Sequence, residues 1–257
     1  MSQQRVVVTG AAGGIGRAIA GRLAEDGYRV VVNDLDAAAV AEVAGAIGAT
    51  AVPGDAASED GVAALVGGAR EALGEIDIWF GNAGVERGRG LDAAEADWAL
   101  SHEVNVLAHV RAARLLVPRW VERGQGRFVV TASAAGLLTM LGSPAYSVTK
   151  HGAVAFAEWL SATYRHRGVV VQAICPQGVR TRMFDEAGAL QELLAHDQAL
   201  TPEEVAAAAR EALDGDHFHV LPHPQVAGYF AQRAADTDRW LAGMNRLQQR
   251  LERDGAL

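Results

Sequence analysis

Short, uninterrupted apolar runs recur along the chain, and this feature constrains the fold more than any other. Strands covered on both faces read as continuous apolar runs, whereas half-exposed strands alternate apolar and polar residues. Segments of helical length separate the runs, which predicts a parallel sheet with helices on both faces and right-handed crossovers. The predicted strands are 5–9, 29–33, 50–52, 76–81, 127–132, 169–174 and 217–221, and the predicted helices are 14–26, 37–47, 59–73, 95–123, 145–167 and 202–213.

Length and composition agree with one α/β domain that buries its own core. The chain has 257 residues, 50% of them hydrophobic, and no repeat or linker divides it. Its net charge of -8 disfavours nucleic acid and anionic membranes as partners. A single cysteine, the absence of a signal-peptide pattern and the absence of an apolar run of ~18 residues predict a cytoplasmic protein without a membrane span.

Two segments near the end of the chain fall outside this alternation. Residues 183–200 have mixed polarity and no strong period, and their length is sufficient for a flap over a ligand site. Residues 224–254 carry apolar and aromatic side chains at roughly helical spacing. This spacing predicts a C-terminal helical segment packed against the body of the protein or against a partner subunit.

A glycine-rich turn, TGAAGGIG at residues 9–16, follows the first predicted strand and opens the first predicted helix. Glycines in such a turn let a pyrophosphate approach the backbone at a helix N-terminus, where free N–H groups and the helix dipole favour anions. The glycines alone are equally consistent with a simple turn. Their position between a strand and a helix favours a dinucleotide site.

Asp34 ends the second predicted strand and predicts which dinucleotide binds. A carboxylate at this position can accept hydrogen bonds from the adenosine ribose hydroxyls, and it repels a 2′-phosphate. No arginine or lysine stands next to Asp34 or in residues 11–14 to offset that repulsion. We therefore predict NAD in preference to NADP. The plainer interpretation is a strand-end or helix-capping aspartate, and Asp36 competes for the capping role.

Tyr146 and Lys150 are four residues apart in a predicted helix and therefore share one helical face. A free tyrosine has a pKa of about 10 and is a poor base at neutral pH. Positive charge from Lys150 and from an oxidised nicotinamide favours the phenolate and lowers that pKa. The tyrosine could then exchange a proton with an alcohol or a ketone. The spacing alone is common by chance, but Ser133 ends the fifth predicted strand, where the ligand crevice of such a sheet lies.

Taken together, these segments resemble the ~250-residue branch of the short-chain dehydrogenase/reductase family, with its TGxxxGxG and YxxxK motifs, over roughly residues 5–182. The resemblance implies a single Rossmann-type, doubly wound domain with a seven-stranded parallel sheet. It implies the catalytic residues Asn105, Ser133, Tyr146 and Lys150. The cofactor-binding residues that it implies, with Asp34, are Gly10, Gly14, Ile15, Gly16, Asp55, Ala56, Asn82, Ala83, Gly84, Tyr146, Lys150, Pro176, Gly178, Val179 and Thr181.

The resemblance also implies a role for each catalytic residue. Tyr146 is the general acid/base, Ser133 positions the substrate oxygen, and Asn105 completes a proton relay. Lys150 holds the ribose and lowers the pKa of the tyrosine. Gln177 departs from the family's usual Pro-Gly pair after the sixth strand, although Gly178 and Thr181 keep the turn and its hydroxyl. Family members usually assemble through the two long helices, so a homotetramer or homodimer is expected.

The substrate is expected to be a small alcohol or ketone, hydrophobic or cyclic, because residues 137–141 are mostly apolar. The leading hypothesis is an NAD(H)-dependent oxidoreductase that interconverts a secondary alcohol and a ketone. An NADPH-dependent biosynthetic ketoreductase and a non-catalytic dinucleotide sensor are the alternatives, and the intact Ser133, Tyr146 and Lys150 disfavour the sensor. The predicted substrate residues are Ser133, Leu138, Ser143, Tyr146 and Gln177.

Three weaker features are interpreted conservatively. His217, His219 and His223 cluster near the last predicted strand, but no acidic or cysteine partner follows at ligand spacing, so no metal site is predicted. Cys175 is interpreted as a small buried residue. Glu86, like the arginine that follows it, could edge the substrate pocket, but a solvated loop charge is the default interpretation.

Overall fold

The computed structural model describes residues 3–186, 198–253 and 255. These residues contain one seven-stranded sheet in the order β3-β2-β1-β4-β5-β6-β7, and every neighbouring pair is parallel. The predicted parallel sheet is therefore confirmed. The strands are β1 (Arg5–Thr9), β2 (Arg29–Asn33), β3 (Thr50–Ala51), β4 (Ile78–Gly81), β5 (Gly126–Thr131), β6 (Val169–Ile174) and β7 (His219–Val220).

Some strands are shorter than the apolar runs that predict them. β4 begins at Ile78 although the run begins at Ile76, and the carbonyl oxygen of Ile76 accepts a hydrogen bond from Trp120 Nε1 at 2.7 Å. β7 omits His217, whose carbonyl oxygen accepts a hydrogen bond from Gln172 Nε2 at 3.1 Å. In both places a side chain satisfies a backbone group that the sheet would otherwise pair.

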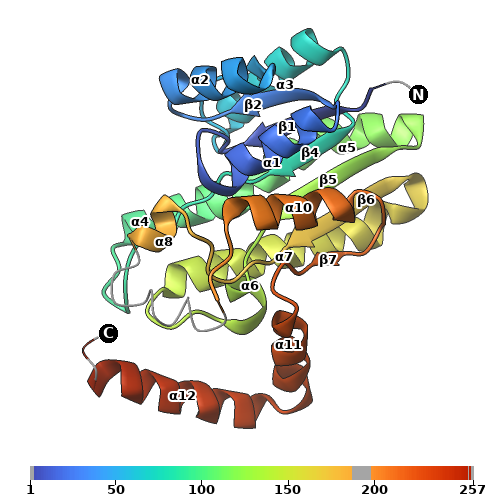
Figure 1. Ribbon diagram of the computed structural model, residues 1–257. Helices are drawn as coiled ribbons and strands as arrows, with labels where there is room; N and C mark the ends of the chain where they lie inside the picture. The colour runs from blue at the N-terminus through green and yellow to red at the C-terminus, as the bar shows by residue number, and fades with distance from the viewer. Residues whose placement is uncertain (1–2, 187–197, 254, 256–257) are drawn as a thin grey trace.

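Helices cover both faces of the sheet (Figure 1). Alternate side chains of β1 divide between the two faces, since Val6 and Val8 pack on one side and Val7 on the other. This burial on both faces explains the continuous apolar runs. The helices on the first side are α1 (Gly14–Glu25), α2 (Ala37–Ile47) and α10 (Pro202–Ala212), and those on the second are α3 (Glu59–Leu73), α5 (Ala108–Arg123) and α7 (Pro144–Tyr164).

The prediction of one helix over residues 95–123 is wrong in detail. The segment consists of α4 (Glu95–His102), a π-helical turn η1 (Glu103–Leu107) and then α5. A π-turn inserts an extra residue into the helical register and often marks a functional site. Here it contains the buried Asn105, whose side chain hydrogen-bonds to the backbone of Val85 in the loop after β4.

The predicted C-terminal helical segment forms two helices, α11 (Gln225–Ala235) and α12 (Thr237–Arg253). The break falls at Asp236, whose φ of -153° and ψ of 88° are not helical and whose Oδ1 accepts the N–H of Arg239 at 2.9 Å. α11 leads away from β7, and α12 runs along the lower edge of the molecule (Figure 1). The remaining short helices are α6 (Ala135–Leu138), α8 (Arg182–Asp185) and the 3-10 turn η2 (Arg165–Arg167).

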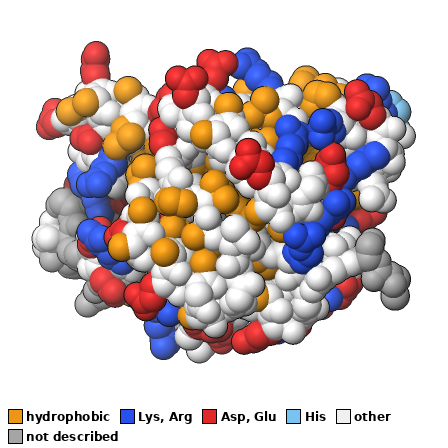
Figure 2. Space-filling view, turned by 90° about the horizontal axis from the view of Figure 1, so that it is seen from above, with side chains coloured by type: hydrophobic (Ala, Val, Ile, Leu, Met, Phe, Trp, Pro, Cys, Tyr) orange, Lys and Arg blue, Asp and Glu red, His pale blue; other side chains and the backbone are white. Residues whose placement is uncertain are grey.

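The surface shows no large region of one charge on the face seen from above. Acidic and basic side chains are interspersed there with hydrophobic ones (Figure 2). Such a mixed face differs from the basic stripe that nucleic-acid binding requires. Within residues 3–186, 198–253 and 255, no helix is both long enough and apolar enough to cross a membrane.

Gly16 provides a test of how tightly the start of α1 packs. A Cβ at this position would lie 2.2 Å from the carbonyl oxygen of Gly10 and 2.5 Å from Asn82 Nδ2. We expect Gly16→Ala to lower the free energy of unfolding by about 1–3 kcal/mol or more, because the overlap must be relieved by backbone movement. Urea unfolding of the variant against the wild type measures this.

Gly21→Ala is the matched control. Gly21 lies in the same helix, and a Cβ there meets no atom within 4 Å. This variant should be neutral or more stable by up to ~1 kcal/mol, because alanine is the better helix former. Equal stability of the two variants would show that the loop yields freely and would contradict the packing argument.

Candidate active site

The glycine-rich loop is joined to the segment that follows β4. Thr9 Oγ1 accepts the N–H groups of Asn82 and Ala83 at 2.9 and 3.0 Å, and Asn82 Nδ2 donates to the carbonyl oxygens of Thr9 and Gly10 at 3.0 and 3.2 Å. Gly10 has a φ of +63°, and a Cβ there would lie 2.8 Å from Ala83 Cα. The loop therefore requires glycine at this point, and its backbone stays open to the cavity. This arrangement fits the pyrophosphate of a dinucleotide.

The structure separates the roles of the two aspartates after β2. Asp36 caps α2, since its Oδ1 accepts the N–H of Ala39 at 3.0 Å. Asp34 lines the cavity instead, and its Oδ2 accepts the N–H of Ala12 at 3.0 Å. The Asp34 carboxylate is thus fixed beside the glycine-rich loop. Carboxylate oxygens accept more than one hydrogen bond, so Asp34 can still accept from a ribose hydroxyl.

One cavity of about 760 Å³ contains most of the predicted cofactor-binding residues. Gly16 lies behind the lining, where it packs against Gly10. Asp55 and Ala56 are also not among the described lining residues, and the Asp55 carboxylate accepts the N–H groups of Ala57 and Ser58. The cofactor contacts of Asp55 and Ala56 stay predictions. The predicted residues that line the cavity are Gly10, Gly14, Ile15, Asp34, Asn82, Ala83, Gly84, Tyr146, Lys150, Pro176, Gly178, Val179 and Thr181.

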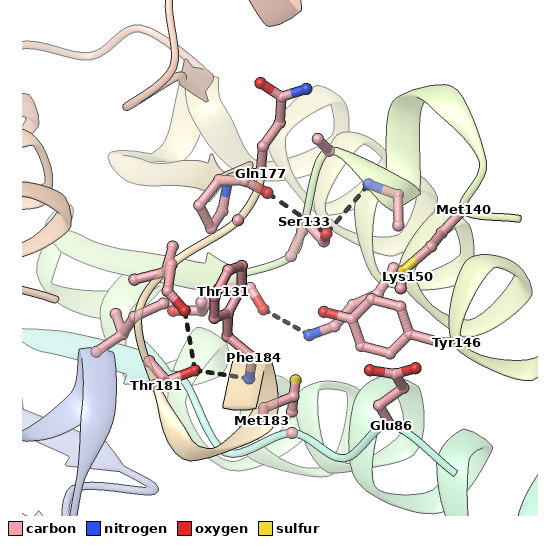
Figure 3. A pocket seen from close by; sticks show the side chains of 18 of the residues that line it. Glu86, Thr131, Ser133, Met140, Tyr146, Lys150, Gln177, Thr181, Met183 and Phe184 are labelled. Atoms are coloured by element: carbon pink, nitrogen blue, oxygen red, sulfur yellow. Dashed lines mark hydrogen bonds between the residues drawn. The ribbon is translucent and has the colours of Figure 1, made fainter. Parts of the chain in front are cut away.

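Ser133, Tyr146 and Lys150 meet in the same cavity, where their polar ends point toward one another (Figure 3). Ser133 Oγ accepts the N–H of Ala135 at 3.1 Å. Lys150 is buried, its Nζ donates to the carbonyl oxygen of Thr131 at 2.9 Å, and it lies 5.5 Å from the centre of the Tyr146 ring. The end of β5 and the first turns of α7 thus supply the three predicted catalytic groups.

Asn105 joins this group from the π-turn. Its Oδ1 accepts the N–H of Val85 at 2.9 Å, and its Nδ2 donates to the carbonyl oxygen of Val85 at 2.9 Å and to Thr149 Oγ1 at 3.0 Å. A Cβ on Gly84 would lie 3.3 Å from both Asn105 Oδ1 and Lys150 Nζ. Asn105 therefore holds the segment after β4 against α7. Its predicted part in a proton relay stays a prediction.

Burial sets the proton affinities of the two central groups. It raises the pKa of Tyr146 to about 12; a hydrogen bond with Ser133 lowers this pKa, and the charge of Glu86 raises it. Burial also lowers the pKa of Lys150 to about 8. In the chain without cofactor, desolvation of the phenolate outweighs the favourable contacts. The lowering of the Tyr146 pKa by Lys150 together with an oxidised nicotinamide stays a prediction.

The substrate end of the cavity differs from the prediction at Ser143. Leu138 and Gln177 line the cavity as expected. Ser143 is fully buried outside the lining, and its hydroxyl donates to Glu86 Oε1 at 2.6 Å. Glu86, for which a solvated charge is the default interpretation from the sequence, lines the cavity in place of Ser143. Nothing in the local sequence signals the bond between them, because 57 positions separate the two residues.

The C-terminal helices contribute residues that sequence reasoning did not assign to the site. Trp240, Met244 and Leu247 of α12 line the cavity, and their i, i+4, i+7 spacing was the available signal. Of the predicted flap over residues 183–200, Met183 and Phe184 in α8 line the cavity. Residues 187–197 of that segment lie outside the described residues.

Two of the three clustered histidines, His219 and His223, and the buried Cys175 pack against or bond to neighbouring parts of the protein. His219 packs edge-on against Phe230 of α11, with ring centres 6.0 Å apart, and His223 Nδ1 accepts the N–H of Gln177 at 3.1 Å. In the part of the chain that the structure describes, no three metal-ligating side chains cluster. Burial raises the pKa of Cys175 to about 12, which disfavours the nucleophilic thiolate at neutral pH.

Comparison with known proteins identifies the family. Residues 4–192 match the family model described as short chain dehydrogenase. The chain is 36% identical over 230 residues to 1-deoxy-11-beta-hydroxypentalenate dehydrogenase of Streptomyces exfoliatus, which covers 86% of this chain and 83% of that protein. It is 32% identical over 191 residues to the oxidoreductase UcpA of Escherichia coli strain K12, covering 72% of this chain and 73% of UcpA.

A solved structure agrees with both the fold and the family. The short chain dehydrogenase/reductase from Burkholderia phymatum, determined in complex with NAD, superposes with a TM-score of 0.85 and 28% identity, covering 92% of this chain and 95% of that one. The seven-stranded parallel sheet is therefore of the Rossmann type. The chain belongs to the short-chain dehydrogenase/reductase family, whose members are oxidoreductases.

Lys150 is the only lysine in the sequence, so its titration can be followed without assignment. In protein labelled with 13C-lysine, the Cε resonance should titrate with a pKa of about 8, because burial disfavours the charged amine. NMR spectra collected across the stable pH range measure this value. A pKa at or above the ordinary 10.5 would contradict the burial argument.

Stability measurements provide the control. The pKa of Lys150 is lower in the folded chain than in the unfolded chain, so burying the protonated amine costs stability below pH about 8, and this cost fades as the pH rises toward 10.5. Lys150→Met should therefore be more stable than the wild type at neutral pH. The difference in urea unfolding should narrow at higher pH, and a constant difference would count against the argument.

Proposed function

We propose that this chain is a single-domain, NAD(H)-dependent oxidoreductase that interconverts a secondary alcohol and a ketone. The observation that carries the proposal is the meeting of Ser133, Tyr146 and Lys150 in one cavity with the glycine-rich loop and Asp34. Membership of the family, with relatives named as dehydrogenases, supports an enzyme that acts on a CH–OH group.

Tyr146 exchanges the proton in this mechanism. In the oxidative direction the substrate hydroxyl lies against Ser133 Oγ and Tyr146 Oη, and its proton passes to Tyr146 in its phenolate form. When bound, NAD would supply the acceptor for the hydride, a hydrogen with two electrons, that leaves the carbinol carbon. A pKa of about 12 keeps Tyr146 protonated in the chain alone. Positive charge added to the cavity favours the phenolate, so cofactor binding and proton transfer are coupled.

The apolar lining supports a hydrophobic or cyclic substrate. Leu138, Met140 and Leu141 come from the segment between β5 and α7, and Phe184 and Trp240 come from α8 and α12. Met140 is held in place because both its N–H and its carbonyl oxygen are hydrogen-bonded by Ser147 Oγ, at 2.9 and 3.1 Å. Met140 is thus fixed by the helix that also holds Tyr146.

Assembly into a homotetramer or homodimer through α5 and α7 is part of the proposal. Exposed apolar side chains on these helices support it. Leu115 is 37% exposed, Val148 57% and Trp159 56%, and the rings of Trp159 and Phe156 stack with centres 6.2 Å apart. Large exposed apolar side chains gathered on neighbouring helices are typical of subunit contacts.

Tyr146→Phe tests the proton-transfer role. We expect the variant to lose about 10²–10⁴-fold or more in kcat while its dissociation constant for NADH changes little, because only the ionisable hydroxyl is removed. NADH formation at 340 nm and fluorescence titration with NADH measure the two quantities. Tyr164→Phe, further along the same helix, is the matched control and should retain activity. Turnover close to that of the wild type in Tyr146→Phe would sink the assignment.

Asp34→Ser tests the cofactor preference. The wild type should have a much higher kcat/KM with NAD than with NADP, and the variant should narrow this ratio at least about tenfold, because the charge that repels a 2′-phosphate is gone. Asp36→Ser is the control, since serine keeps the cap of α2 and the ratio should not change. A wild type that prefers NADP would instead support the biosynthetic ketoreductase.

A further inference from the structure

Glu86 is a buried acid in a largely apolar part of the cavity. Its side chain is only 9% exposed, and it lines the cavity together with Met140, Leu141 and Met183. Figure 3 shows its carboxylate beside the ring of Tyr146. An ionised carboxylate in such surroundings is costly unless it is paired and hydrogen-bonded. A carboxylate at this place therefore needs hydrogen-bond or ion-pair partners.

The partners that the structure describes occupy only one of its two oxygens. Glu86 Oε1 accepts the hydroxyl hydrogen of the buried Ser143 at 2.6 Å and lies 3.3 Å from Nη2 of the half-exposed Arg89. Among residues 3–186, 198–253 and 255, no donor reaches Oε2. The carboxylate is therefore fixed in orientation by Ser143, and it keeps an oxygen that can accept a hydrogen bond in the cavity.

Glu86 and Tyr146 line the same cavity, and the Glu86 carboxylate lies beside the Tyr146 ring (Figure 3). The charge of Glu86 accordingly raises the pKa of the Tyr146 phenol. A substrate whose oxygen contacts Ser133 and Tyr146 therefore brings the carbons next to its carbinol carbon near Glu86. A hydrogen-bond donor on those carbons meets Glu86 Oε2 as an acceptor. A negatively charged group there meets the negative charge of the Glu86 carboxylate.

We propose that Glu86 determines substrate specificity by accepting a hydrogen bond from a hydroxyl or ammonium group on a carbon near the reacting carbinol, while it excludes substrates with a carboxylate there. The preferred substrate is then an apolar, ring-sized alcohol with a second hydrogen-bond donor. This inference rests on the proposed alcohol–ketone activity and names the substrate class of the same site. A site built to hydrogen-bond a substrate donor discriminates strongly against analogues that lack it.

Four alcohols on one ring scaffold test the proposal. These are cyclohexanol, cyclohexane-1,2-diol, 2-aminocyclohexanol and 2-hydroxycyclohexane-1-carboxylate, each assayed for kcat/KM with saturating NAD. Relative to cyclohexanol, the wild type should favour the diol and the amino alcohol about tenfold or more, because a hydrogen bond to a charged group is stronger than a neutral one. It should disfavour the carboxylate by at least a similar factor.

Glu86→Gln separates recognition from structure. Glutamine can still accept the Ser143 hydroxyl, but it carries no charge and presents an NH₂ donor where Oε2 stood. The advantage of the amino alcohol over cyclohexanol should fall about tenfold, and the penalty on the carboxylate should disappear. A residue that only braces the loop would change all four substrates alike. Glu95→Gln is the control, because it removes one exposed acid in α4 and should leave every ratio unchanged.

Calorimetric binding makes the test independent of turnover. Cyclohexylamine, cyclohexanol and cyclohexanecarboxylate are titrated into the NAD-saturated wild type and Glu86→Gln. Tighter binding of the amine than of the carboxylate, lost in the variant, supports the proposal even if no alcohol of the panel is oxidised, and that result would count against the proposed function alone. Unchanged ratios in Glu86→Gln, or a wild type that prefers the carboxylate, would overturn the inference.

Discussion

The burial of Lys150, which reaches from α7 to the end of β5, is the constraint on which the rest of the site depends. A buried ammonium needs an acceptor, and its Nζ finds one in the carbonyl oxygen of Thr131. This bond fixes α7 against the sheet and, with it, Tyr146 one helical turn earlier. The same desolvation lowers the pKa of the amine and raises the pKa of the phenol. Tyr146 therefore stays protonated in the chain alone, and in the proposed mechanism the positive charge of the cofactor favours its phenolate.

Small residues and amides connect this lysine to the cofactor end of the cavity. The absence of a side chain at Gly84 lets Lys150 Nζ and Asn105 Oδ1 both lie close to it. Asn105 in turn bonds both to the backbone of Val85 and to Thr149 of α7. Asn82, two residues before Gly84, donates hydrogen bonds to the glycine-rich loop. The glycine-rich loop, the segment after β4 and α7 therefore form one hydrogen-bonded frame, which holds the predicted cofactor-binding and catalytic residues in a fixed relation to one another.

The parts of the structure that the sequence could predict are those that depend on local patterns. Apolar runs gave the strands, and fixed spacings gave the glycine-rich loop and Tyr146 with Lys150. The π-turn around Asn105 could not be predicted, because helical periodicity continues through it and the hydrogen-bond partner of Asn105, Val85, lies in another loop. The break at Asp236 had the same difficulty, since the apolar spacing on both sides suits one helix.

The two cavity carboxylates show why cofactor recognition is easier to predict than substrate recognition. Asp34 is held by the N–H of Ala12, so its place follows from the fold wherever a strand ends beside such a loop. Glu86 is held by the side chain of Ser143, 57 positions away, and its role depends on a contact that no local pattern encodes. The proposed role of Glu86 thus makes substrate specificity depend on a pairing between the segment after β4 and the start of α7. Under this proposal, replacing Glu86 or Ser143 changes the preferred substrate while the hydrogen bond that holds Asp34 stays intact.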